Sequence, residues 1–371
     1  MLYLHIPFCK QACSYCNFHF STSMRTRPGV LAGMVHELEA RRGELPEGPV
    51  PSIYFGGGTP SLLTGDELGL LFTTIERMGY WAGEADTEIT LEANPDDLTP
   101  DTIARLADSP VNRLSIGIQS FDEEDLRFMH RAHNAREALT AVEKVTAAGF
   151  QDVSIDLIYG AQTTSDATWQ RNLDLATQLG VNHIAAYALT VEPKTALGHR
   201  VASGAVPDTS DERFARQFSL LIDHLTGAGF EHYEVSNFAR PGHRSRHNSG
   251  YWTGQPYLGI GPGAHSFDGA YRRRWNVSNN ARYATHPLLY EEEVLTERDR
   301  YNEYVMTALR RTEGVSLVSL TETFGEDYAR HFTEEVAGYV REGLLSCGPA
   351  HYRLTREGLP LADGIAAAAF R

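Results

Sequence analysis

The sequence predicts an α/β protein: a partial (β/α)6 barrel, TIM-like, followed by a small α-rich unit. Three observations predict this class. Short apolar runs alternate with amphipathic stretches up to about residue 230, the pattern of parallel strands joined by crossover helices. Polar side chains gather where these runs end, as functional groups do in barrels. Beyond about residue 300 the pattern changes to helices and a short hairpin. An open doubly wound sheet also fits the alternation.

The barrel half consists of two interleaved sets of segments. The apolar runs expected to be strands are Leu2–Pro7, Ser52–Phe55, Glu88–Glu92, Arg113–Ile118, Asp152–Ile158 and His183–Leu189. The stretches expected to be helices lie around 29–43, 65–80, 100–107, 134–148, 166–179 and 211–228. Start and stop signals support this, because Thr99-Pro100-Asp101 begins one helix and Gly149 and Gly229 end two others.

The second half has a different organisation. One more strand, Tyr233–Phe238, precedes a Gly-, Arg- and His-rich stretch from Arg240 to Gly263 that has no regular period. Helices at 301–312, 317–324 and 328–343, followed by a hairpin of 344–346 and 351–354, resemble a winged-helix unit. We therefore predict a barrel (1–230), a barrel-covering region (231–300) and a small C-terminal domain (301–371).

Composition excludes several classes of function. The chain has 371 residues with 33 basic and 48 acidic side chains, and its net charge of −15 disfavours nucleic-acid binding. No apolar run of about 18 residues occurs and no leader opens the chain, so we expect neither a membrane span nor export. Only Cys347 lies outside the N-terminal cysteine cluster, which favours a reducing, cytoplasmic location.

Cys9, Cys13 and Cys16 have the spacing C-x3-C-x2-C. Three thiolates on one short loop lie close enough to bind one compact metal centre. An iron–sulfur cubane normally takes four cysteines, so three would leave one iron open to a reactive ligand. A zinc site completed by His5 or His19 is the alternative, and three unrelated thiols are the simplest explanation.

Further polar and glycine residues mark the ends of successive strands. The segment Gly56–Pro60 (GGGTP) ends the second run, where glycines let the backbone approach a ligand closely or simply make a tight turn. No Gly-Lys-Ser/Thr follows, so this segment is not a P-loop. Glu92 ends the third run, Gln119 follows the fourth and Asp156 lies in the fifth. A buried polar group without a partner costs roughly 1–3 kcal/mol, so three at equivalent places predict a shared ligand.

Together these motifs resemble the radical S-adenosylmethionine (SAM) proteins of the oxygen-independent coproporphyrinogen III oxidase family. The matching positions are Tyr3–Cys16, Gly56–Pro60, Glu92, Gln119, Arg131 and Ser154–Gly160, and the similarity covers nearly the whole chain. The resemblance implies a [4Fe–4S] cluster on Cys9, Cys13 and Cys16, with SAM at the open iron. In this family one-electron reduction cleaves the sulfonium to a 5′-deoxyadenosyl radical, which implies an electron donor.

The resemblance also implies which residues contact SAM. The methionyl amino group would meet Gly57, Gly58, Thr59 and Glu92. The methionyl carboxylate would pair with Arg131, because a guanidinium fork matches two oxygens. The ribose hydroxyls would bind Gln119 and Asp156, and the adenine would lie near Thr190. Tyr3 and Tyr15 would flank the cofactor near the cluster. Without the family, Arg131 could be a surface charge and Asp156 a strand-end cap.

Two features distinguish the branches of this family. The oxidases carry a fourth cysteine two residues after the third, where this chain has Phe18, and an N-terminal extension ahead of the first barrel strand, at which this sequence begins. The chain has instead the segment 247–252 (HNSGYW), which matches the H-N-x-x-Y-W motif of the haem chaperone branch.

This motif has side chains suited to haem. His247 offers an imidazole, a common axial ligand of haem iron, and Asn248 follows it. Flat apolar faces for a macrocycle come from Tyr251, Trp252 and Tyr257. Propionate partners would be Arg240, Arg244 and Arg246. The alternative is a basic, aromatic loop that only packs over the barrel mouth.

The sequence therefore predicts a haem chaperone of the radical SAM type in the cytoplasm. It would bind a [4Fe–4S] cluster, SAM and haem, and pass the haem to an acceptor protein that the sequence does not identify. We assign no catalytic residue. The runner-up is an oxygen-independent coproporphyrinogen III oxidase that decarboxylates propionates, and the third hypothesis is a zinc-stabilised binding protein without redox chemistry.

Overall fold

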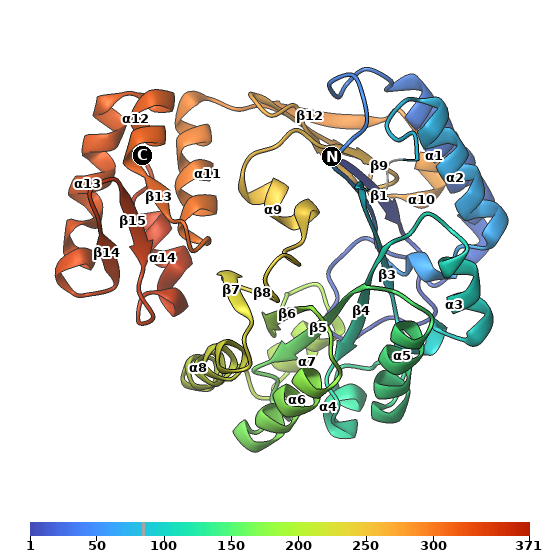
Figure 1. The fold of residues 1–371 in the computed structure, drawn as a ribbon, viewed down its shortest axis with the longest axis horizontal. Coiled ribbons are helices and arrows are strands. Elements are labelled where there is room, and N and C mark those ends of the chain that lie inside the picture. Colours follow the sequence, from blue (N-terminus) through green and yellow to red (C-terminus); the bar gives the residue numbers. More distant parts are fainter. Residues whose placement is uncertain (84–85) are drawn as a thin grey trace.

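A curved, mainly parallel sheet forms the centre of the protein (Figure 1). The computed structural model describes residues 1–83 and 86–371. Its six central strands pair in chain order and in parallel: β1 (Leu2–Ile6), β2 (Ser52–Gly57), β3 (Glu88–Ala93), β4 (Arg113–Gln119), β5 (Asp152–Tyr159) and β6 (His183–Ala188). The predicted partial (β/α)6 barrel is confirmed.

Both ends of this sheet carry additional strands. β9 (Leu258–Ile260) pairs in parallel with β1, so a segment from far along the chain extends the first edge. At the other edge β8 (Asn237–Ala239) pairs antiparallel with β6, and β7 (Glu231–Glu234) pairs antiparallel with β8. The single strand expected at 233–238 was wrong, because the chain reverses at Val235 and Ser236. The strand order β7-β8-β6-β5-β4-β3-β2-β1-β9 leaves the barrel open.

The long helices that cover the outer face of the sheet lie where the sequence predicted them. They are α1 (Arg27–Ala40), α2 (Gly65–Arg77), α3 (Pro100–Ala107), α5 (Ala135–Ala147), α6 (Asp166–Gln178) and α8 (Asp211–Gly227). Two short helices were not predicted, α4 (Glu123–Phe128) and α7 (Ala196–Ala202), because six or seven residues are too few to show a helical period. Among the described residues, no helix combines the length and apolar character needed to cross a bilayer.

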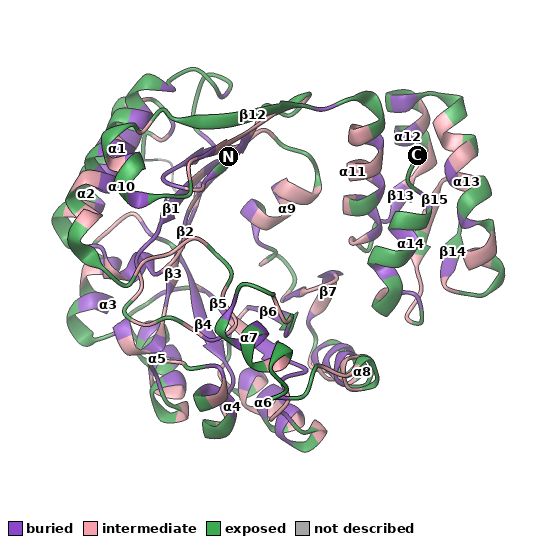
Figure 2. Cartoon of the chain, turned by 180° about the vertical axis from the view of Figure 1, so that it is seen from behind, coloured by how far each residue is buried: buried purple, intermediate pink, exposed green. Residues whose placement is uncertain are grey.

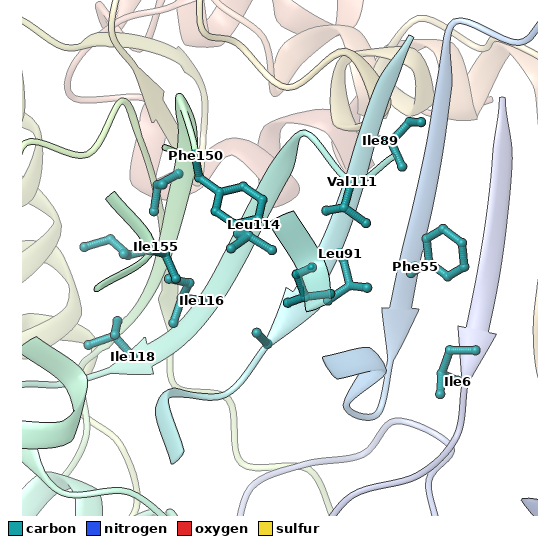
Figure 3. Packing of buried hydrophobic residues seen from close by; sticks show 14 of the residues in the cluster. Ile6, Phe55, Ile89, Leu91, Val111, Leu114, Ile116, Ile118, Phe150 and Ile155 are labelled. Atoms are coloured by element: carbon teal, nitrogen blue, oxygen red, sulfur yellow. The ribbon is translucent and has the colours of Figure 1, made fainter. Parts of the chain in front are cut away.

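Side chains alternate between the two faces of the strands. Apolar residues such as Phe55, Leu91 and Leu114 point outward, lie next to one another across β2, β3 and β4, and are completely buried (Figure 3). Figure 2 shows buried positions along the strands and on the sheet-facing sides of the surrounding helices. The alternate positions point inward and are polar, among them Tyr54 and Glu92. The inside of the barrel is therefore a polar lumen rather than a packed core.

The region between the barrel and residue 295 contains one unexpected helix. α9 (Arg246–Trp252) lies within the stretch expected to be irregular, and it sits on the concave side of the sheet (Figure 1). The remaining elements are α10 (Asn280–Thr285) and a separate three-stranded sheet of β10 (His265–Phe267), β11 (Arg272–Asn276) and β12 (Tyr290–Val294). α9 has seven residues, which are too few for a helical period to be recognised in the sequence.

A C-terminal unit packs beside the open side of the barrel (Figure 1). It consists of α11 (Glu297–Leu309), β13 (Val315–Ser316), α12 (Leu317–Phe324), α13 (Glu326–Arg341), β14 (Leu345–Cys347), β15 (His351–Leu354) and α14 (Ala362–Ala368). Helices followed by a small sheet confirm the winged-helix-like prediction. The unit has its own apolar core, and the Val235 amide donates to the Arg310 carbonyl at 3.0 Å to join it to the barrel.

A buried carboxylate joins α1 to the β9 edge of the barrel. Glu37 accepts hydrogen bonds from Arg41 (2.7 Å), Asn276 (2.8 Å), the Gly261 amide (3.0 Å) and the Tyr283 hydroxyl. Burial raises the pKa of Glu37, and the charge of Arg41 opposes that rise. Arg41 also pairs with Glu44 at 2.7 Å, so the guanidinium lies between two carboxylates.

We expect Glu37→Ala to lower the free energy of unfolding by about 1–3 kcal/mol, because the Asn276 side chain and the Gly261 amide lose a buried acceptor while Arg41 keeps its ion pair with Glu44. Urea denaturation followed by circular dichroism measures this. Glu39→Ala is the control, since Glu39 is exposed on the same helix, pairs with Arg77, and should cost less than about 1 kcal/mol. Equal effects of the two substitutions would contradict the structural role of Glu37.

Candidate functional site

The cysteine loop, residues 9–16, follows β1 at the carboxyl edge of the sheet and is held by backbone contacts from two other loops. The Ser14 amide donates to the Met129 carbonyl at 3.0 Å, and the Leu197 amide donates to the Ser14 carbonyl at 2.7 Å. The Gln11 side chain donates to the His130 carbonyl at 2.8 Å. Lys10 forms ion pairs with Asp96 and Asp97 after β3. The loop is thus positioned by residues more than eighty positions away.

The three thiols of this loop, Cys9, Cys13 and Cys16, are free and half-buried. Both imidazoles that a zinc site would use are engaged elsewhere: His5 Nε2 bonds the His19 carbonyl at 2.8 Å, and His19 Nε2 bonds Asn280 at 2.7 Å. Within the described residues no three His, Cys, Asp or Glu side chains converge on a point where a single ion could bind. The donor set that stays available is three thiols, which fits a cubane with one open iron.

The glycine segment after β2 makes a cradle that only small residues allow. Gly57 has φ +106°, and a Cβ there would lie 2.5 Å from the His5 ring. A Cβ on Gly58 would lie 2.7 Å from the Phe8 carbonyl oxygen. The Gly58 amide donates to the Ile6 carbonyl at 2.9 Å, and the Thr59 amide donates to the Phe8 carbonyl at 2.7 Å.

Glu92 points into the lumen beside this cradle. The Tyr54 hydroxyl donates to its Oε1 at 2.8 Å and the Gly57 amide donates to its Oε2 at 3.1 Å. Burial raises the pKa of Glu92 to about 7, and the nearby charge of Asp156 adds to the effect. Binding a cation beside Glu92 would favour its ionised form.

Arg131 lies between the cysteine loop and the strand ends. Its Nη1 donates to Cys13 Sγ at 3.2 Å, and its Nη2 donates to Asn94 Oδ1 at 2.6 Å and to the Gly117 carbonyl at 2.8 Å. Its Nε is buried without a partner in the described chain, so a donor remains available for a ligand carboxylate. Tyr15 lies close enough for the Arg131 charge to act on its hydroxyl.

Asn94 is a site residue that the sequence reasoning missed. It accepts from Arg131 and donates through Nδ2 to Thr59 Oγ1 at 3.0 Å, so it joins two predicted SAM contacts. Its position, two residues after Glu92 and directly after β3, was the available signal. A second omission is Tyr187 on β6, where burial of the hydroxyl raises its pKa and the nearby charge of Asp156 adds to the effect.

Backbone strain marks the same edge. In the described chain two non-glycine residues have positive φ, Gln119 at 66° and His130 at 57°. Gln119 ends β4 at an irregularity of the strand pairing, and His130 directly precedes Arg131. Such conformations cost roughly 1–3 kcal/mol each and are concentrated at functional sites. Both therefore support a ligand site here.

The remaining predicted SAM residues lie around the lumen. Asp156 accepts from Ser115 Oγ at 3.1 Å, and burial raises its pKa to about 6. Tyr3 is hydrogen-bonded to His5 Nδ1 at 3.0 Å. Thr190 is exposed just beyond β6. The structure thus gathers the cysteine loop, Gly57–Thr59, Glu92 and Arg131 by direct contacts, and the SAM roles of all these residues stay predictions.

The haem motif lies at the opposite, amino edge of the sheet. Glu88, the first residue of β3, accepts from the amides of Arg246 and His247 at 2.9 Å each and so holds the start of α9. The His247 ring bonds Ser52, the first residue of β2, at 2.9 Å. Ser52 and Gly57 are five residues apart on β2, which separates the motif from the glycine cradle by about 17 Å.

His247 is buried with both ring nitrogens engaged. Nδ1 bonds Ser52 Oγ, and Nε2 bonds the Tyr251 hydroxyl at 3.1 Å. Burial lowers the pKa of His247 to about 3, so the ring is neutral. Haem iron could bind His247 only after one of these hydrogen bonds breaks. Ser245 caps the helix, because its Oγ accepts from the backbone amide of Asn248 at 3.2 Å.

The propionate partners expected from the sequence are engaged with protein groups. Arg240 donates to the Ala228 carbonyl, Arg244 pairs with Glu231 and Glu313, and Arg246 pairs with Asp86. The structure therefore argues against these three arginines as propionate ligands. The aromatic residues of the motif do face open space: Tyr251 and Trp252 line a groove of about 640 Å³ beside the C-terminal unit.

Comparisons with known proteins agree with this geometry. A family model described as the radical SAM superfamily matches residues 3–176, and one described as the HemN C-terminal domain matches residues 295–361. The haem chaperone HemW of Mycobacterium tuberculosis is 36% identical over 98% of this chain and 93% of its own length. HemW of Bacillus subtilis is 30% identical over 98% of this chain and 97% of its own.

Among solved structures, the coproporphyrinogen III oxidase HemN of Escherichia coli aligns with a TM-score of 0.85. The alignment covers 100% of this chain and 89% of that chain at 21% identity, so it shows a shared fold. The full-length similarity to HemW proteins confirms the branch predicted from Phe18 and the segment 247–252. The chain belongs to the HemW haem chaperone family of radical SAM proteins.

Proposed function

We propose that the protein binds haem and passes it to an acceptor protein, while the cysteine loop holds a [4Fe–4S] cluster with SAM. The observation that carries this proposal is the similarity to haem chaperones over nearly the whole chain. The position of the aromatic haem motif supports it, because the motif lies at the edge of the barrel away from the SAM cradle. We also propose a cytoplasmic location, from the free thiols and the family, and an electron donor if the cluster is reduced.

The oxidase alternative has weaker support. Decarboxylation by a 5′-deoxyadenosyl radical needs a propionate beside the SAM cradle, whereas Tyr251 and Trp252 line a groove beside the C-terminal unit. At the position of the fourth cysteine of the oxidases, Phe18 is 69% exposed. The likeness to HemN shows the fold alone.

An anaerobic assay with haemin and coproporphyrinogen III side by side tests the function. We expect stoichiometric haemin uptake, seen as a Soret band, and transfer of the haem to apomyoglobin as a model acceptor. Coproporphyrinogen III should remain unchanged under reducing conditions with SAM. Consumption of coproporphyrinogen III with release of carbon dioxide, without haem transfer, would establish the oxidase instead.

The cluster assignment predicts that Cys13→Ala removes the visible absorbance of the iron–sulfur cluster and lowers the iron content of the protein, because three thiolates hold the cubane. Cys347→Ala is the matched control, since Cys347 is exposed on β14 and should leave the absorbance unchanged. Anaerobic purification with iron and sulfide analysis checks both variants. Full iron content in Cys13→Ala would exclude the assignment.

The raised pKa of Glu92 predicts a pH dependence of SAM binding. Since the ionised carboxylate attracts the methionyl ammonium, affinity should rise as pH increases through about 7, where Glu92 loses its proton. The other titratable groups that act on or near Glu92 are Tyr3, Tyr54, Asp156, Tyr187, Tyr251 and Cys16.

Calorimetry at pH 6, 7 and 8 measures this dependence. Glu92→Gln should weaken SAM binding at pH 8 and flatten the profile, because its amide does not ionise. Asp156→Asn should keep the rise of affinity with pH but move it to lower pH, because the Asp156 charge contributes to the raised pKa of Glu92. A profile that Glu92→Gln leaves unchanged would refute the contact.

A further inference from the structure

A groove of about 640 Å³ separates α9 from the C-terminal unit. One wall carries the aromatic side chains of Tyr251, Trp252 and Tyr257, and the opposite wall carries Tyr304 and Phe324 of α11 and α12. This volume lies within the usual range of ligand sites, about 300–1,000 Å³, and aromatic walls suit a flat apolar ring system. A thioether and an imidazole that could bind iron, Met306 and His351, also line it.

Two buried N–H donors in this groove have no acceptor in the described chain. Trp252 Nε1 and Arg311 Nε are both inaccessible to solvent and unbonded. Buried donors are nearly always hydrogen-bonded in folded proteins, and an acceptor on a ligand in this groove would satisfy both. Glu234 Oε2, on the strand that bridges to Arg311, is a buried acceptor that is also without a partner among the described residues. Arg311 lies just beyond the end of α11, and its backbone forms an isolated antiparallel β-bridge with Glu234 of β7.

The charges in the groove also favour an anionic ligand at Arg311. The acidic residues of the lining are already paired: Glu303 with Arg273 at 2.7 and 2.9 Å, and Glu313 with Arg244 at 3.1 Å. No carboxylate pairs with the Arg311 guanidinium among the described residues. Trp252 and Arg311 line this groove and also a smaller neighbouring cavity together, and a guanidinium and an indole N–H can each donate to a carboxylate oxygen.

We propose that haem lies in this groove and that Arg311, together with the indole N–H of Trp252, binds one of its propionates. The proposal rests on the proposed function and adds a residue outside the H-N-x-x-Y-W motif. His247 then acts as a positioning residue: it bonds the Tyr251 hydroxyl, and Tyr251 packs edge-on against Tyr257 with the ring centres 4.8 Å apart. The motif would thus shape the wall against which the macrocycle lies.

The test compares haemin with haemin dimethyl ester, in which both propionates are esterified. Each is titrated into the wild-type protein, Arg311→Met and Arg330→Met, with binding followed by the Soret band. Arg311→Met should weaken haemin binding about 10- to 100-fold, the loss expected for a hydrogen bond to a charged group. It should leave binding of the ester unchanged, since the ester lacks the charge. Arg330→Met, on the exposed side of α13, should change neither.

Two further variants allow the proposal to be tested even if Arg311→Met does not fold. Arg311→Lys should restore part of the haemin affinity, and Trp252→Phe should weaken haemin but not the ester while retaining an aromatic face. If Arg311→Met fails to fold, Trp252→Phe provides the same comparison. Unchanged haemin affinity in a folded Arg311→Met, or equal loss of haemin and ester, overturns the proposal. Absence of haemin binding by the wild-type protein overturns the proposed function itself.

Discussion

The alternation of polar and apolar side chains along β2–β5 is the constraint on which the rest of the structure depends. With one face of each strand packed against helices, Phe55, Leu91 and Leu114 must point outward. The period of two then turns Tyr54, Glu92 and Asp156 toward one lumen, and a slip of one residue would invert both faces. The same register therefore stabilises the barrel and brings the candidate SAM contacts together.

Several residues at the carboxyl edge of the sheet adopt energetically unfavourable states, and the packing of the barrel offsets the free energy that these states cost. Gln119 and His130 adopt positive φ, and burial raises the pKa of Glu92 to about 7. The carbonyls of Met129 and His130 accept hydrogen bonds from the cysteine loop and hold it at this edge. Arg131 contacts both Cys13 and Asn94, so this one side chain connects the thiols of the cysteine loop to the strand ends.

The two ends of the lumen lie apart, but a chain of side-chain contacts joins them. His247 stacks on Tyr54 with ring centres 4.9 Å apart, and Tyr54 donates to Glu92, so one chain of contacts joins the amino edge to the SAM cradle. The C-terminal unit completes the groove at the open side of the barrel, where β7 and α11 meet through backbone hydrogen bonds. In the proposed site, a haem in this groove would lie apart from the cysteine loop.

The sequence by itself determined the partial barrel, its six long helices, the winged-helix-like unit and the family, because these follow from local period, turn residues and closely spaced motifs. It also pointed to most of the candidate SAM contacts through their places at strand ends. Only the tertiary structure revealed α9, β9, the role of Asn94 and the free guanidinium of Arg311. The first three depend on partners tens to hundreds of residues away, and the last depends on which side chains packing leaves without a partner. Two-turn helices and three-residue strands are also too short to leave a period. The tertiary structure also determines that His247 is buried and that Arg240, Arg244 and Arg246 bind other groups of the protein. Hydrogen-bond partners are set by packing rather than by residue type.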